Sequence, residues 1–183
     1  AQNLRYERDE DAEITEISSQ IIDQTKRVTR IVQSLMNFSH SGQNQHDNHE
    51  AVRLFDIANE AIHLLSLNNM AKTVHFFNLC DTEHWVQGDP QRLAQVLINL
   101  LSNARDASPE LGHIYIRTTA SHSNVELFIE DQGSGISAAS LEHLFEPFFT
   151  TKDPGQGTGL GLALVHSIIE EHHGDISVES PTD

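Results

Sequence analysis

The strongest constraint in this sequence is a run of four glycines at alternate positions, residues 155–161. The run reads GQGTGLGL and leads into the apolar segment ALVHSII. Glycines at this spacing cannot hold a regular element, but they permit positive φ and a close approach of backbone to a ligand. Glycine-rich backbone before a helix presents unpaired amide groups to an anion, usually a phosphate; a flexible turn is the alternative. Three- and four-residue steps predict that helix: Leu160, Leu164, Ser167, Ile168 and Glu171.

The composition limits the partners and the compartment. The chain has 183 residues and a formal net charge of −16, so we expect no binding to nucleic acid. An acidic protein that binds a nucleotide must concentrate its few cations or use a divalent metal. The single cysteine, Cys80, excludes an internal disulfide and indicates a reducing, cytoplasmic compartment. No apolar run is long enough to span a bilayer, so we expect no membrane contact by this chain.

Residues 14–38 are predicted to form a long helix with one apolar seam. A helix of this kind cannot bury its seam alone, so we expect a partner helix and a homodimer through this segment. The helix is expected to end by residue 42, and the polar residues 43–49 to form a linker to a main domain at 50–183. Heptad-like spacings connect the seam positions Ile14, Ile17, Ile21, Val28, Ile31, Leu35 and Phe38.

The main domain is predicted to be an α/β two-layer sandwich, with a mixed, mostly antiparallel sheet and helices on one face. Hairpin-connected strands argue against a doubly wound parallel sheet. Asp56 is expected to be the N-cap of the first helix, and Asp89-Pro90 to open the central one. Strands are predicted at 51–55, 73–79, 84–87, 113–120, 125–130 and 175–179, and a short helix at 138–144. The buried face of the central helix is predicted to comprise Leu93, Val96, Leu97, Leu100, Leu101, Ala104 and Ala107.

Amide side chains are stacked along one face of that central helix. Gln95, Asn99 and Asn103 are four residues apart, and Asp106 lies near the same face. Asn has a poor propensity for helix interiors, so two stacked Asn residues call for a reason. An amide oxygen is a hard, neutral ligand that suits Mg²⁺, which also bridges phosphates. The alternative is that these amides satisfy backbone groups or solvent.

Two further segments carry candidate binding groups. Asp131 ends a predicted strand and is followed by Gly133 and Gly135; this carboxylate could accept a hydrogen bond from an exocyclic amine while the glycines admit a flat ring. A tight turn is the alternative for this segment. Lys152 follows the apolar segment 144–149 and stands just before the glycine run, which makes it a candidate phosphate ligand in a chain with 11 cations. We expect the three Phe residues before it to pack in the core or a lid.

Taken in order, the Asn helix, the DQGSG segment, PFFTTK and GTGLGL resemble the catalytic ATP-binding domain (Bergerat fold) of sensor histidine kinases of two-component systems, of the nitrogen-regulation-type subgroup. The resemblance covers about residues 50–180. Residues 14–38 are similar to the second helix of the dimerisation and histidine-phosphotransfer hairpin. The resemblance implies ATP and Mg²⁺ as cofactors, a response-regulator receiver domain as partner, and a parent protein that is compatible with an inner-membrane anchor.

The resemblance also implies roles for single residues. Asn103 corresponds to the Mg²⁺-binding Asn, with Asn99 in the same site one turn earlier. Asp131 corresponds to the adenine-recognising carboxylate, and Gly133 and Gly135 lie beside the base. Lys152 resembles the cation that faces the γ-phosphate. The lid residues expected to meet the phosphates are Gly157, Thr158, Gly159, Leu160 and Gly161.

The sequence departs from the family in three places. Many relatives carry Lys three residues after the Mg²⁺ Asn, where this chain has Asp106; either Arg105 or Lys152 could supply the missing charge. The phosphoacceptor motif is absent, and we interpret His40 as a cap or surface residue. The chain also stops short of the strand that usually closes this fold. We interpret the remaining candidate metal-binding histidines as solvated residues: His46, His49, His172 and His173.

These features predict the nucleotide-binding part of a kinase that lacks the histidine it phosphorylates. One alternative is a hydrolytic ATPase of the same superfamily, which places a Glu one turn before the Mg²⁺ Asn. Here that position is Asn99, which cannot act as a base, so the kinase is favoured. A second alternative is a non-catalytic dimerisation or binding module. A P-loop enzyme is excluded because the chain has no GxxxxGK motif.

Overall fold

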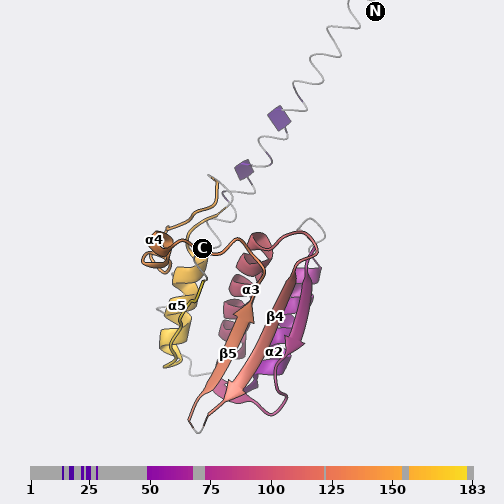
Figure 1. Ribbon diagram of the computed structural model, residues 1–183, viewed down its shortest axis with the longest axis vertical. Helices are drawn as coiled ribbons and strands as arrows, with labels where there is room; N and C mark the ends of the chain where they lie inside the picture. The colour runs from indigo at the N-terminus through magenta and orange to yellow at the C-terminus, as the bar shows by residue number, and fades with distance from the viewer. Residues whose placement is uncertain are drawn as a thin grey trace, which may run out of the picture.

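The computed structural model describes residues 49–67, 73–121, 123–153 and 157–180, with isolated positions between Ile14 and Val28. Helices α2 and α3 lie behind strands β4 and β5 in Figure 1, and α5 lies beside α3, so the predicted two-layer α/β sandwich is confirmed. The elements are β1 (Glu50–Arg53), α2 (Leu54–Ser66), β2 (His75–Leu79), β3 (Trp85–Gly88), α3 (Pro90–Ala107), β4 (His113–Ala120), β5 (Val125–Glu130), α4 (Ala138–Leu141) and α5 (Gly161–Glu171).

The described strands pair in two groups. Strand β4 is central to one group, because it pairs in parallel with β2 and antiparallel with β5. Strand β1 pairs antiparallel with β3 in the other group. The predicted mixed, mostly antiparallel pairing and the predicted β4–β5 hairpin are therefore confirmed, although the pairs form two sheets in the described part of the chain.

Helix α3 starts as its sequence predicts. The Asp89 side chain accepts hydrogen bonds from the backbone N–H groups of Gln91 and Arg92, at 2.9 and 3.1 Å. Pro90 occupies the first turn, where its missing N–H has no partner to lose. The strongest single helix signal in the sequence thus fixes the first residue of the helix that carries the candidate amides.

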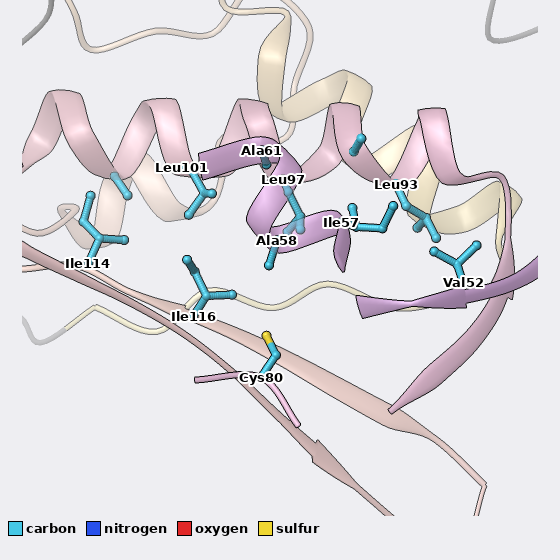
Figure 2. Packing of buried hydrophobic residues seen from close by; sticks show 12 residues of the cluster. Val52, Ile57, Ala58, Ala61, Cys80, Leu93, Leu97, Leu101, Ile114 and Ile116 are labelled. Atoms are coloured by element: carbon cyan, nitrogen blue, oxygen red, sulfur yellow. The ribbon is translucent and has the colours of Figure 1, made fainter. Parts of the chain in front are cut away.

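The main core lies between α2, α3 and the sheet. Leu101 on α3 meets Ile114 and Ile116 on β4, and all three are fully buried (Figure 2). Ala58 and Ala61 on α2 are also fully buried, which lets α2 pack closely on α3. Burial of a Leu or Ile side chain stabilises the fold by about 1.5–3 kcal/mol, so Leu101, Ile114 and Ile116 hold α3 firmly against the sheet.

Two assignments near the start of the main domain are wrong. The strand expected at 51–55 ends at Arg53, and α2 begins at Leu54. Asp56 is not the N-cap; it lies in the first turn of α2, where its carboxylate accepts a hydrogen bond from Arg53 Nε at 2.7 Å. An acidic residue in a first turn is favourable for the same electrostatic reason as an N-cap, so the two positions look alike in sequence.

The strand expected at 175–179 is also wrong, since these residues form no strand. Of the two large apolar residues in this segment, Ile176 packs against a second cluster formed by α3 and α5, and Val178 is exposed. The buried members of that cluster are Val96, Leu164, Val165 and Ile168.

The buried face of α3 differs from the prediction in its last turn. Ala107 is exposed, whereas Arg105 is 9% exposed and belongs to the buried face. Leu93, Leu97, Leu101 and Arg105 follow one another at four-residue steps, so the guanidinium continues the core-facing row. Because Arg105 is charged, a search for apolar residues at helical spacing did not predict that this position is buried.

His172 is a structural residue rather than a solvated one. It follows α5 and is half-buried; its Nε2 accepts a hydrogen bond from the Asp89 backbone N–H at 3.0 Å, and its Nδ1 donates to the Ile168 carbonyl at 2.7 Å. Arg92 and Glu171 form an ion pair beside it. The end of α5 is thereby fastened to the start of α3, and the neutral tautomer with hydrogen on Nδ1 satisfies both contacts.

The predicted N-terminal helix and linker fall largely outside the described residues. Ile14, Ile17 and Val28 are helical and exposed. The apolar seam, the dimer that it implies and the domain boundaries therefore stay predictions. Across the part of the chain that the structure describes, no helix combines the length and apolar character needed to cross a membrane.

Candidate functional site

One cleft brings together the four sequence segments that carry candidate binding groups. Its lining includes α3, the loop after β5 and the segment that precedes α5, and it extends to residues of β3, β5 and the segment 172–180. Every residue predicted for the site lines this cleft: Asn99, Asn103, Asp131, Gly133, Gly135, Lys152, Gly157, Thr158, Gly159, Leu160 and Gly161. Residues up to 62 positions apart in the sequence, Asn99 and Gly161, are neighbours here, because an ideal Cβ on Gly161 would lie 3.3 Å from Asn99 Oδ1.

The amide wall of the cleft is provided by α3. The Asn99 side chain donates through Nδ2 to the Gln95 carbonyl at 3.0 Å, which orients its Oδ1 toward the start of α5. The half-buried Asn103 side chain makes no hydrogen bond within the described residues. The alternative reading, in which the amides serve the backbone, thus applies to the NH₂ group of Asn99 and leaves amide oxygens facing the cleft.

Asp131 lies at the end of β5 and caps the turn that follows. Its Oδ1 accepts a hydrogen bond from the Gly133 N–H at 2.7 Å, as the tight-turn reading expects. Its Oδ2 accepts none within the described residues and is available to an external donor. A Cβ on Gly133 would lie 2.8 Å from Ala107 Cβ, so only glycine lets this loop approach the end of α3. Gly135 has a φ of 74°, which L side chains rarely adopt.

The glycine run is held by close backbone contacts. Gly159 has a φ of 66°, and a Cβ on it would lie 2.3 Å from the Phe148 carbonyl carbon. The Phe148 N–H donates to the Gly159 carbonyl at 2.8 Å. Leu160 is 2% exposed and anchors the segment in the core, while α5 starts without a side-chain cap. The first residues of α5 line the cleft, so their N–H groups are candidate donors to an anion.

Phe148 contradicts the expectation that all three Phe residues pack in the core or a lid. Its side chain is 66% exposed and its φ is 70°, an uncommon value for a residue with a side chain. Phe145 and Phe149 are half-buried. The conformation of Phe148 follows from its contact with Gly159, which no local sequence pattern reveals.

Two cations lie beside Asp106. Lys152 Nζ is 2.6 Å from Asp106 Oδ2, and Arg105 Nε is 3.7 Å from Asp106 Oδ1. The ammonium group of Lys152 is thereby held next to α3, one turn beyond Asn103. Sequence reasoning missed Arg105 as a buried residue, although it had noted that either cation could compensate for Asp106.

The donors present fit a magnesium nucleotide. Amide oxygens on α3 suit Mg²⁺, N–H groups at the start of α5 and the ammonium of Lys152 suit phosphates, and a carboxylate with a free oxygen suits an amine. The glycines provide the space that a Cβ would fill. Among the described residues there is no cluster of three or more His, Cys, Asp or Glu side chains that could hold a metal.

Comparison with known proteins bears on the same region. Residues 88–183 match the family model of histidine kinase-, DNA gyrase B- and HSP90-like ATPases. Sensor histidine kinase ZraS of Escherichia coli O157:H7 is 42% identical over 132 residues, which cover 72% of this chain and 28% of that protein. The chain therefore spans little more than a quarter of the length of this relative.

Solved structures agree with the sequence match. The catalytic domain of histidine kinase ThkA superimposes with a TM-score of 0.61 at 32% identity, covering 68% of this chain and 82% of that one. A structure of ThkA in complex with the response regulator protein TrrA gives a TM-score of 0.66 at 29% identity, covering 84% of this chain and 43% of that chain. The chain thus belongs to the family of histidine kinase-, DNA gyrase B- and HSP90-like ATPases and is homologous to the catalytic domains of sensor histidine kinases.

Proposed function

We propose that this chain is the ATP-binding catalytic portion of a sensor histidine kinase, which donates the γ-phosphoryl group of Mg-ATP to a histidine elsewhere in its parent protein. The observation that carries the proposal is that the segments of Asn103, Asp131 and Gly159 meet at α3: an ideal Cβ on Gly161 would lie 3.3 Å from Asn99 Oδ1, and one on Gly133 would lie 2.8 Å from Ala107 Cβ. Scattered positions for these three residues would have removed the basis for a nucleotide site.

Each wall of the cleft has a distinct task in this proposal. Asn103, with Asn99 one turn earlier, holds Mg²⁺, and Asp131 accepts a hydrogen bond from the adenine amine through its free oxygen. The segment from Gly157 to Gly161 offers backbone N–H groups to the phosphates, and Thr158 and Leu160 hold that segment in place. Bound Mg²⁺ neutralises phosphate charge during phosphoryl transfer.

Lys152 and the α5 N-terminus provide the chain's own electrostatic contribution. Their positive ends stabilise the charge that develops on the transferred group, and the rest of the domain orients the reactants. The acceptor imidazole needs no base in this chain, because its neutral nitrogen is already a nucleophile near pH 7.

Phosphoryl transfer is favoured over ATP hydrolysis by the chemistry at Asn99. An amide cannot take a proton from water, and the Asn99 NH₂ group is already bonded to the Gln95 carbonyl. Slow hydrolysis by this chain is therefore expected. Rapid hydrolysis that Asn99→Ala abolishes would instead favour the hydrolytic ATPase.

Calorimetric titration with a non-hydrolysable ATP analogue tests the proposal. Binding should require Mg²⁺. Asn103→Ala should weaken it at least tenfold. Asp131→Asn should weaken the binding of the adenine analogue and leave the binding of a guanine analogue unchanged. Asn59→Ala is the matched control, because Asn59 is exposed on α2 outside the cleft. Absence of binding by the unmodified chain contradicts the proposal, as does binding that none of the cleft variants changes.

A labelling experiment tests the direction of transfer. With γ-labelled ATP this chain should stay unlabelled, because it lacks the phosphoacceptor motif. A longer protein that includes the acceptor helix should gain acid-labile label on His and pass it to an Asp of a receiver domain. Acid-labile label on the present chain would contradict this assignment.

The proposed partners follow from the same assignment. ThkA, a structural relative, is known in complex with a response regulator, which supports a receiver domain as the partner here. We also infer a homodimer through the helix at 14–38, a domain boundary at the linker 43–49 and a cytoplasmic location. Analytical ultracentrifugation tests the dimer, since Ile17→Lys should shift a dimer to a monomer if the apolar seam pairs.

A further inference from the structure

Three charged side chains, Arg105, Asp106 and Lys152, form two ion pairs at the end of α3. Arg105 is buried, Asp106 follows it with its side chain 41% exposed, and Lys152 reaches Asp106 from the segment before the glycine run. Lys152 Nζ lies 2.6 Å from Asp106 Oδ2, and Arg105 Nε lies 3.7 Å from Asp106 Oδ1. The two cations thus face different oxygens of one carboxylate.

The buried cation, Arg105, is only partly satisfied by hydrogen bonds within the described residues. Nε and Nη1 of Arg105 have none among the described residues, and Nη2 donates to Ser102 Oγ at 3.3 Å. A buried charge is costly unless a counter-charge compensates it, and Asp106 is the carboxylate within ion-pair distance in the described part of the chain. Arg105 cannot move out to solvent without losing its place on the core-facing row, so it provides a fixed positive charge behind Asp106.

The half-buried cation, Lys152, is held at both ends. Asp106 binds the ammonium group of Lys152, and Thr150 Oγ1 accepts a hydrogen bond from the Lys152 backbone N–H at 3.2 Å. The lysine side chain has a flexible four-carbon stem, so without Asp106 its charge would be spread over many positions. Asp106 lies three residues after Asn103, on the same side of α3, so the tethered charge is beside the candidate metal ligand.

We propose that Asp106 is a positioning residue that fixes the Lys152 ammonium beside Asn103, at the phosphate end of the cleft. Arg105 neutralises Asp106 from behind, so that the three groups together keep one net positive charge for the phosphates. This inference rests on the proposed nucleotide site and assigns to Asp106 a role that its negative charge alone would not suggest.

The opposite model makes a different prediction. If Asp106 simply competed with the phosphates for Lys152, then removing its charge would strengthen nucleotide binding. A positioning role requires the reverse, because Asp106→Asn leaves the lysine charge present but unplaced. The sign of the change in affinity therefore distinguishes the two models.

The test is a double-mutant cycle on the binding of Mg²⁺ and a non-hydrolysable ATP analogue, measured by calorimetry. Asp106→Asn and Lys152→Met should each weaken binding about 3- to 10-fold, which lies within the range of coupling between contacting residues. The double variant should bind within about twofold of the weaker single variant, because either change alone already removes the placed charge. Asp106→Glu keeps the carboxylate and should restore most of the lost affinity.

The thermal midpoint without nucleotide separates positioning from a structural role. Lys152→Met removes only the partly exposed Lys152–Asp106 pair and should leave the midpoint within about 2 °C of the unmodified chain, whereas Asp106→Asn also removes the counter-charge of the buried Arg105 and should lower the midpoint further. Stronger or unchanged nucleotide binding in Asp106→Asn overturns the inference, as do fully additive effects in the cycle. If the unmodified chain binds no nucleotide, then the proposed function itself fails.

Arg105→Met tests the neutralising charge while keeping an unbranched side chain of similar length. It should weaken nucleotide binding, because Asp106 then cancels the charge of Lys152. Arg105→Met with Asp106→Asn should bind no worse than Asp106→Asn alone. Unchanged affinity in a folded Arg105→Met chain overturns the role of Arg105; if that variant does not fold, the Asp106 and Lys152 cycle still decides the inference.

Discussion

The two walls of the cleft are held in place by different physical means. Helix α3, which forms one wall, packs against the core, where Leu101, Ile114 and Ile116 are fully buried (Figure 2). The wall formed by residues 131–153 and 157–160 depends on backbone conformation, with positive φ at Gly135, Phe148 and Gly159. Hydrophobic burial therefore fixes the residues proposed to hold Mg²⁺, whereas backbone geometry fixes those proposed to meet the base and the phosphates.

This difference separates stability from binding. A substitution in the core beneath α3 should reduce the free energy of unfolding, and should affect nucleotide binding through loss of folded protein. A substitution in the loop wall should reduce affinity while the core stays intact. Four predictions test this contrast, in order of the expected size of the effect.

The largest effect is expected for Leu101→Ala, beneath the amide wall. It should lower the free energy of unfolding by about 2–5 kcal/mol, because it leaves a cavity in a fully buried site. Urea denaturation measures the change. Leu79→Ala is the control, since Leu79 is 60% exposed and its loss should change stability by no more than about 0.5 kcal/mol. Equal effects of the two variants would contradict the contrast.

Gly159→Ala should act on the other wall. Its Cβ would meet the Phe148 backbone at 2.3 Å, and alanine at positive φ costs about 1–2 kcal/mol before any clash. We expect more than tenfold weaker binding of the ATP analogue, with an unfolding transition of the core that persists. Gly161→Ala sharpens the comparison: its Cβ would meet one side-chain atom at 3.3 Å, so its effect should be much smaller.

The end of α5 should behave like the core rather than like the loop. His172→Asn removes the acceptor for the Asp89 N–H and should cost about 1 kcal/mol of stability without a change in nucleotide affinity. The neighbouring His173 is exposed and has a φ of 56°, a conformation that Asn tolerates, so His173→Asn is a near-neutral control. Thermal unfolding and calorimetry of both variants give the comparison.

The smallest effect is expected at the exposed pair of His143 and Glu146, which follows α4 and does not line the cleft. The hydrogen bond and charge of Glu146 raise the pKa of His143 above its ordinary value. Because the folded-state pKa is the higher one, the pair stabilises the fold at pH values below the unfolded pKa, and this contribution disappears as pH rises through the folded pKa. NMR titration should show the pKa of His143 falling in Glu146→Gln, and an unchanged value would contradict the pairing.

The local signals of the sequence predicted much of the α3 wall. Asp89 and Pro90 start α3 as expected, and the four-residue steps of Asn99 and Asn103 place them on one face. These features depend on interactions between residues close together in the sequence, so they can be predicted without knowledge of the tertiary structure. The candidate site residues were likewise predicted from motifs, and the structure places all of them along one cleft.

The missed features depend on partners distant in the sequence. Phe148 takes its conformation from Gly159, His172 is held by Asp89, and Arg105 is buried although it is charged. The segment 175–179 has the alternation of a strand, but Ile176 packs on the cluster of α3 and α5 and Val178 is exposed. Such outcomes are decided by tertiary packing, which overrides the local propensity of a segment.

Amide chemical shifts on the two walls, followed by NMR as the ATP analogue and Mg²⁺ are added, test the central claim most directly. We predict saturable shifts with one common dissociation constant at Asn103 on α3, Asp131 after β5 and Gly159 before α5, and none of them when Mg²⁺ is omitted at the same analogue concentration. Shifts confined to one wall, or dissociation constants that differ between the walls, would contradict a single nucleotide site built from both.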